Sequence, residues 1–159
     1  GKERYKGIID DIDMNNIPYE PQTTNRNTIS GGYSYEELPE PQEYRFLLSS
    51  EKSITTPVKG VYIENIGYID GALHVLTRYD DNLHTDNHGH IELVDSKGNV
   101  IGKKTEIGFS YWDTAHKNSY TEQIIPVPYE QLSECVLQGD FVTAQNYISG
   151  NWQITFPLE

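Results

Sequence analysis

The stretch LHTDNHGHIELVD, residues 83–95, gathers three of the chain's five histidines within residues 84–90. If these residues formed a strand, His88, His90 and Glu92 would project from one face, because side chains two positions apart share a face. Two imidazoles in an H-x-H pair can converge on one borderline metal ion such as zinc. The residue types therefore allow a metal site, with His84 and Asp86 as further candidate ligands.

Three features favour a polar hairpin over a metal site. The other two histidines, His74 and His116, lie in a predicted strand and a predicted loop without paired spacing. The run DNHG, residues 86–89, has the composition of a turn. The face opposite Ile91 and Leu93 should be the solvent face, where polar side chains need no special explanation.

We therefore interpret the stretch as a polar loop that leads into a strand, and we predict no bound metal and no other cofactor. The alternative keeps His84, His88 and His90 as metal ligands. A calcium loop is not supported, because the twelfth residue counted from Asp80 is Ile91 rather than the glutamate that such a loop requires.

Aromatic side chains suggest a different kind of site, one for sugars. Tyr111 and Trp112 are the candidate ligand-stacking residues, since flat rings pack on sugar faces. Strand alternation places Phe109 and Tyr111 on one face and Ser110 and Trp112 on the other, so at least one of these sets should be core. We favour a structural role for these rings, in the core and at its rim.

Motifs for catalysis are absent from the sequence. It contains neither G-x-S-x-G nor H-E-x-x-H, and no Gly-rich phosphate loop follows a predicted strand. The single cysteine, Cys135, cannot form an intrachain disulfide, and its half-apolar setting predicts a buried, inert thiol. We therefore predict a protein that is not an enzyme and has no catalytic residues.

Length and charge limit the class of protein and its partners. With 159 residues the chain suits one ordinary domain, and 12 Tyr, 4 Phe and 2 Trp supply core material. Twelve basic against 24 acidic residues give a net charge of −12, which disfavours nucleic acid and anionic lipid surfaces. No stretch approaches the roughly 18 apolar residues of a spanning helix. Because the chain begins at Gly1 rather than Met, we expect it to be part of a longer protein.

From residue 44 onward the sequence predicts short strands separated by turns. Asp70-Gly71 is a dipeptide that tight hairpins prefer, and Lys97-Gly98 supplies a second turn. Residues 128–135 have a short helical pattern. We predict an all-β fold, an antiparallel two-sheet sandwich that is immunoglobulin-like in the loose sense, with little helix. In the last predicted strand Trp152, Ile154 and Phe156 share one face, which should be apolar core.

Residues 1–45 differ in composition from the rest of the chain. They hold four of the eight prolines and an Asn/Thr/Gly run. We expect a leader or linker there, extended or irregular, in which GIIDDID (7–13) adds an edge strand and one helical turn precedes Pro39. The predicted sandwich domain spans 46–159.

Three stretches resemble a known family. They are IENIGYIDGALHVLTRYDDN (63–82), DNHGHIELVDSKGNVIG (86–102) and the closing GNWQITFPLE (150–159). They resemble the C-terminal extracytoplasmic domain of membrane-anchored anti-sigma-factor-like proteins of Gram-positive bacteria, a family of domains of unknown function. The resemblance covers about residues 54–159.

The resemblance implies a place and a role. In that family a cytoplasmic segment holds the sigma factor, one helix crosses the membrane and β-sandwich domains lie outside. This chain would then be the soluble extracytoplasmic part of a single-pass protein, a negative effector of an extracytoplasmic-function sigma factor. Its role would be sensory, interaction or spacer, with a protein or cell-wall ligand as partner. Membrane and sigma factor would be contacted only through segments outside this sequence. The alternative is a carbohydrate-binding or adhesion module at the cell surface.

Overall fold

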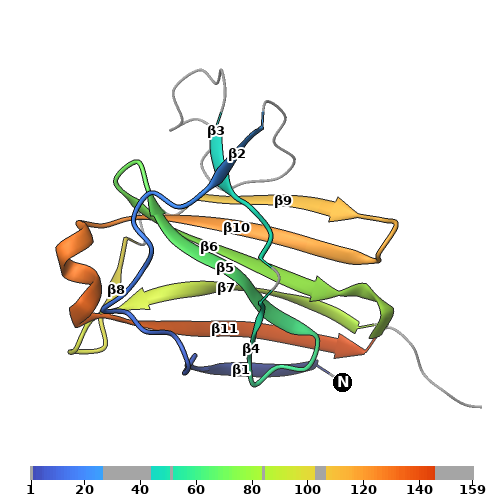
Figure 1. Cartoon of the computed structure of the whole chain (residues 1–159). Helices are drawn as coiled ribbons and strands as arrows, with labels where there is room; N and C mark the ends of the chain where they lie inside the picture. Colours follow the sequence, from blue (N-terminus) through green and yellow to red (C-terminus); the bar gives the residue numbers. More distant parts are fainter. Residues whose placement is uncertain (1, 27–43, 51, 84, 103–106, 146–159) are drawn as a thin grey trace, which may run out of the picture.

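The computed structural model describes residues 2–26, 44–50, 52–83, 85–102 and 107–145. These residues form an antiparallel sandwich of two sheets with a smaller two-stranded sheet beside it (Figure 1). The elements are β1 (Lys2–Ile8), β2 (Thr23–Arg26), β3 (Tyr44–Leu47), β4 (Ile54–Thr55), β5 (Val61–Ile69), β6 (Ala72–Asp80), η2 (Asp81–Leu83), β7 (Thr85–Val94), β8 (Val100–Ile101), β9 (Ile107–Asp113), β10 (Asn118–Pro126), η3 (Tyr129–Glu134) and β11 (Val136–Gln145). The four-stranded sheet has the order β1-β11-β7-β8, the five-stranded sheet β4-β5-β6-β10-β9, and the third sheet β2-β3. The predicted all-β sandwich is confirmed.

The main core lies between the four-stranded and the five-stranded sheets. Ile91 and Leu93 of β7 and Phe141 of β11 face it from one side, and Leu73 and Val75 of β6 face it from the other. All five side chains are fully buried. The alternation predicted for β7 is therefore confirmed on its apolar face, because residues two apart share one side of a strand.

Turn chemistry sets the two hairpins that were predicted from dipeptides. Asp70 and Gly71 join β5 to β6 with φ angles of 50° and 81°, the doubly positive geometry that such a turn requires. Gly98, with φ 82°, lies in the β7–β8 hairpin, where the Asp95 side chain accepts the backbone N–H groups of Lys97 and Asn99. The predicted short helix at 128–135 is observed as the 3-10 helix η3.

A second, smaller core lies on the outer face of the five-stranded sheet, beneath β3. Leu47 packs there with Ile69 and Leu76. The backbone N–H of Leu47 also donates to both carboxylate oxygens of Glu122, each at 3.1 Å, and His74 Nδ1 lies 2.8 Å from Glu122 Oε2. Glu122 and His74 are buried. A buried ionisable pair thus holds β3 against the sheet.

The described part of the N-terminal segment packs directly on the sandwich. Strand β1 forms an edge of the four-stranded sheet by pairing with β11. Only its last two residues, Gly7 and Ile8, lie within the expected edge strand 7–13. That strand could not continue to residue 13, because Asp11 takes a φ of 65°, outside the extended region. Ile9 and Ile17 then enter the main core. The helical turn predicted before Pro39 lies outside the described residues.

The predicted core face of the last strand also lies outside the described residues, at Trp152, Ile154 and Phe156. Within the described ranges, no helix is long and apolar enough to cross a membrane.

A buried side-chain amide joins the two main sheets. Gln123 of β10 donates from Nε2 to the carbonyl oxygen of Ile91 at 3.0 Å, and its Oε1 accepts the N–H of Ile91. Strand β8 pairs with β7 only at Leu93 and Val94. The Gln123 amide therefore binds backbone groups of β7, at Ile91, that β8 does not reach. The amide therefore fixes the spacing of the two sheets at this point, since buried backbone groups require partners.

The thiol of Cys135 is buried, as predicted, and burial raises its pKa above the ordinary value. Because the thiolate is the reactive form, we expect the folded protein to resist the thiol reagent DTNB at pH 8. After unfolding in urea, one thiol per chain should react at once. Rapid stoichiometric labelling of the folded protein would contradict this burial.

Candidate functional site

The histidine-rich stretch is a strand and not a loop, so the turn predicted at residues 86–89 is wrong. Strand β7 runs without interruption from Thr85 to Val94 and pairs with β11 at every one of these residues. Gly89 has a φ of 152°, and a Cβ at this position would overlap the carbonyl oxygen of Asp140. Glycine is therefore needed here for the close approach of β11, and not for a change of chain direction.

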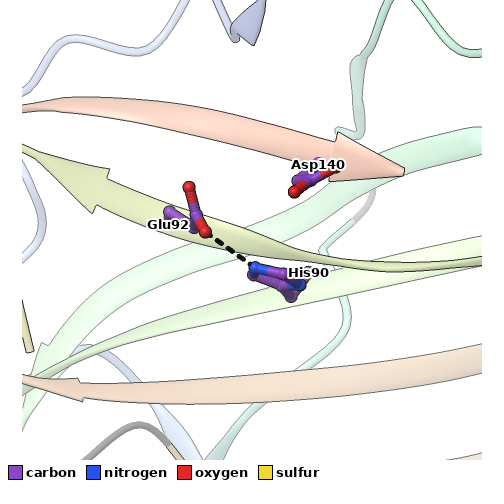
Figure 2. Close-up of side chains that lie close together, drawn as sticks. All are labelled: His90, Glu92 and Asp140. Atoms are coloured by element: carbon purple, nitrogen blue, oxygen red, sulfur yellow. Dashed lines mark hydrogen bonds and ion pairs between the residues drawn. The ribbon is translucent and has the colours of Figure 1, made fainter. Parts of the chain in front are cut away.

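Strand pairing brings three metal-ligating side chains together on the outer face of the four-stranded sheet. His90 of β7 lies directly opposite Asp140 of β11, and Glu92 follows on the same face. Ligand atoms of these three residues all lie within 4.8 Å of one another. Figure 2 shows His90 and Glu92 joined on β7, with Asp140 beside them on β11. We call His90, Glu92 and Asp140 the histidine–carboxylate cluster.

Hydrogen bonds orient both oxygens of the Glu92 carboxylate. His90 Nε2 lies 2.8 Å from Oε1, and Gln138, the residue opposite Glu92 on β11, donates from Nε2 to Oε2 at 3.1 Å. The Glu92 side chain is only 9% exposed, whereas that of His90 is 35% exposed. The expectation that this whole face is open to solvent is therefore wrong at Glu92. Its carboxylate is shielded from solvent and is hydrogen-bonded by His90 and Gln138.

Arg4 supplies a positive charge to the cluster from the edge strand β1. Its Nε and Nη2 donate to the two oxygens of Asp140 at 2.9 and 2.8 Å, a bidentate pair. The Arg4 side chain is 62% exposed, but that of Asp140 is 12% exposed. The hydrogen bond from Arg4 holds the pKa of Asp140 below its ordinary value, and the charges of Arg4, His90 and Lys6 act in the same direction.

The lowered pKa of Asp140 predicts a pH-dependent stability. The ion pair stabilises the folded protein above the unfolded-state pKa of about 3.9, and this contribution is lost as the pH falls through the lower folded-state pKa. We expect Asp140→Asn to be less stable than the wild type at pH 7, and this difference to shrink as the pH falls through the folded-state pKa of Asp140, so that it is smaller at pH 2 than at pH 7. Urea unfolding at both pH values measures this, and an equal difference at both would contradict it.

Of the three histidines in the predicted metal alternative, one belongs to the cluster. His90 is the shared residue; His88 lies in β7 opposite Val142, with its side chain outside the described part of the structure, and His84 lies outside the described residues. Sequence reasoning missed Arg4 and Asp140. The signal that could have found Asp140 is the polar alternation of Gln138 and Asp140 in β11. These two residues lie opposite Glu92 and His90, which becomes visible only when the two strands are paired.

The remaining two histidines lie elsewhere and have separate partners. His74 is bound to Glu122 beneath β3, on the five-stranded sheet. His116 is exposed, and its Nδ1 lies 2.8 Å from Asp113 Oδ2 in the turn after β9. Neither histidine therefore contributes to the histidine–carboxylate cluster.

The two candidate sugar-stacking aromatics are not brought together. Tyr111 stacks on Tyr120, its cross-strand partner, with ring centroids 4.7 Å apart and planes at 8°. Trp112 is the next residue of β9, opposite Ser119, and it is 62% exposed. Because neighbouring strand residues face opposite ways, Tyr111 packs on the second core while Trp112 offers one separate ring.

Chemically, the cluster combines an imidazole with two carboxylates on a rigid two-strand support. These nitrogen and oxygen donors are ligand types for divalent transition metals, and an imidazole beside a carboxylate can also exchange protons. The fold and this site define an all-β sandwich protein with a polar cluster on the outer face of one sheet. The chain matches no family model, no curated protein and no solved structure.

Proposed function

We propose that this chain is the non-enzymatic extracytoplasmic domain of a membrane-bound anti-sigma factor, a negative effector of an extracytoplasmic-function sigma factor. One observation carries the proposal: two of the stretches that resemble this family coincide with one hairpin in each of the two main sheets. Residues 63–82 cover most of β5–β6 in the five-stranded sheet, and residues 86–102 cover all but the first residue of β7–β8 in the four-stranded sheet. The resemblance therefore rests on the residues that build the fold.

Buried polar side chains that connect separate strands support a scaffold role. Glu64 on β5 accepts a hydrogen bond from Arg78 of β6 at 3.0 Å, Glu122 holds the N–H of Leu47, and Gln123 binds the backbone of β7. Because these buried polar groups are already hydrogen-bonded within the protein, they stabilise the fold, and a ligand or partner would be recognised by surface residues. A partner protein or cell-wall ligand would bind the surface of the domain, whereas sigma factor and membrane would be contacted by other parts of the parent protein.

The sequence that encodes the parent protein upstream of Gly1 gives the first test. We expect one apolar segment of about 20 residues, preceded by a short cytoplasmic head. Deleting the present domain from the parent should change a sigma-dependent reporter several-fold, while the parent remains in the membrane. A secretion signal with a cell-wall anchor and no cytoplasmic head would overturn the proposal.

A cell-surface carbohydrate-binding or adhesion module is the second candidate, and the exposed ring of Trp112 favours it. An exposed indole on an edge strand offers a flat surface to a sugar ring. Calorimetry against a panel of cell-wall glycans would detect binding, and Trp112→Ala should abolish it. A flat response of the wild type across the panel would exclude this candidate.

A further inference from the structure

The histidine–carboxylate cluster has the donor set and the spacing of a divalent metal site. Zinc bonds to imidazole nitrogen and carboxylate oxygen are about 2.0–2.2 Å long, so ligands around a tetrahedral ion lie roughly 3.4 Å apart. His90, Glu92 and Asp140 present ligand atoms that are all within 4.8 Å of one another. Small side-chain rotations would therefore place one ion between the three residues.

The support of the cluster is already organised for such an ion. His90 and Asp140 are direct cross-strand partners in the continuous β7–β11 ladder, so their Cβ atoms are held close by the backbone. Gly89 lets the backbone of Asp140 approach β7, and Gln138 orients the second oxygen of Glu92. In known metal sites, hydrogen bonds from neighbouring residues orient the side chains that bind the metal in the same way.

The two negative charges of the cluster favour a bound cation. Two carboxylates with side chains only 9% and 12% exposed, Glu92 and Asp140, lie together on this face. Arg4 provides one neutralising charge through its bidentate contact with Asp140. Because the Arg4 side chain is 62% exposed, it can leave Asp140 without opening the core. The guanidinium therefore binds the two Asp140 oxygens, one of which a metal ion would require as a ligand.

We infer that His90, Glu92 and Asp140 form a binding site for a zinc-class divalent ion, and that Arg4 is its built-in competitor. One imidazole nitrogen and two carboxylate oxygens suit zinc and its borderline neighbours, while calcium and magnesium prefer oxygen ligands alone. Three protein ligands leave a fourth position of the ion for water. The site is independent of the function proposed above.

Zinc titration by calorimetry at pH 7, in a buffer that does not bind metals, tests the inference. We expect one ion per chain and a rise of the melting temperature with zinc concentration, because an ion that binds only the folded state stabilises it. His90→Ala, Glu92→Gln and Asp140→Asn should each weaken binding at least about tenfold. Calcium or magnesium in excess should not compete.

The decisive variant is Arg4→Gln, which should bind zinc about tenfold more tightly than the wild type because the competing guanidinium is gone. A gain in affinity cannot result from misfolding. Arg45→Gln is the matched control, since it removes the same charge from an ion pair with Glu20 and Asp70 and should leave zinc affinity unchanged.

A second control uses the exposed pair formed by His116 and Asp113. His116→Ala removes an imidazole that contacts a single carboxylate, Asp113, and should not affect zinc binding. Absence of zinc binding, binding that survives His90→Ala, or an unchanged affinity of Arg4→Gln would each overturn the inference.

Discussion

Replacing Glu122 with alanine should lower the free energy of unfolding by about 3–5 kcal/mol, the usual effect of removing one partner of a buried pair. The Glu122 side chain is 1% exposed, and its oxygens bind His74 and the N–H of Leu47. Without the carboxylate, both groups stay buried and lose this partner. Urea unfolding at pH 7, followed by far-UV circular dichroism, measures the difference.

Asp113→Ala provides the control for this prediction. Asp113 and His116 form the same chemical pair at the same 2.8 Å, but the His116 side chain is 77% exposed. Exposed pairs contribute little to stability, so this variant should lower the free energy of unfolding far less than Glu122→Ala. Equal effects of Glu122→Ala and Asp113→Ala would show that the buried pair does not hold β3 against the five-stranded sheet.

Replacing Phe141 with alanine should also lower the free energy of unfolding by about 3–5 kcal/mol, because it removes a large ring from a closely packed core. Phe141 is fully buried between the two main sheets, next to Asp140 on β11. Phe141→Leu, which keeps much of the volume, should cost clearly less. Both values come from the same urea unfolding measurement.

Trp112→Ala is the matched aromatic control for Phe141. It removes a larger ring that is 62% exposed on β9, and should change stability by no more than about 0.5 kcal/mol. A small effect of Phe141→Ala, close to that of Trp112→Ala, would mean that β11 does not face the main core. Such a result would contradict the sandwich arrangement.

Most of the strands, and the two hairpins with turns at Asp70-Gly71 and Lys97-Gly98, could be predicted because their signals are local. Asp70-Gly71 and Gly98 specify turns because aspartate and glycine accept the positive φ angles that most residues avoid. The structure shows positive φ angles at all three positions. Ile91 and Leu93 specify the inner face of β7 by alternation alone. The burial of Cys135 likewise followed from the apolar residues around it.

The misread segment shows the limit of such local signals. The composition of residues 86–89 is found in turns as well as in strands. Their pairing with β11 could therefore not be derived from these residues alone. The composition around Gly89 suggested a turn, but glycine is needed there because of the backbone of Asp140, 51 positions further along the chain. The expected solvent face was wrong at Glu92 for a similar reason, since Gln138 comes from the partner strand.

The sequence by itself determined the all-β class, the turns at Asp70-Gly71 and Lys97-Gly98 and the apolar face of β7, because each depends on residues adjacent in the chain. Only the tertiary structure decided which strands pair and in which register. Shifting β11 by two residues against β7 would keep the same side chains facing the core, yet His90 would then lie opposite Gln138 or Val142 instead of Asp140. Alternation cannot distinguish these registers, so the cluster and its contact with Arg4 depend on the packing of the whole sandwich.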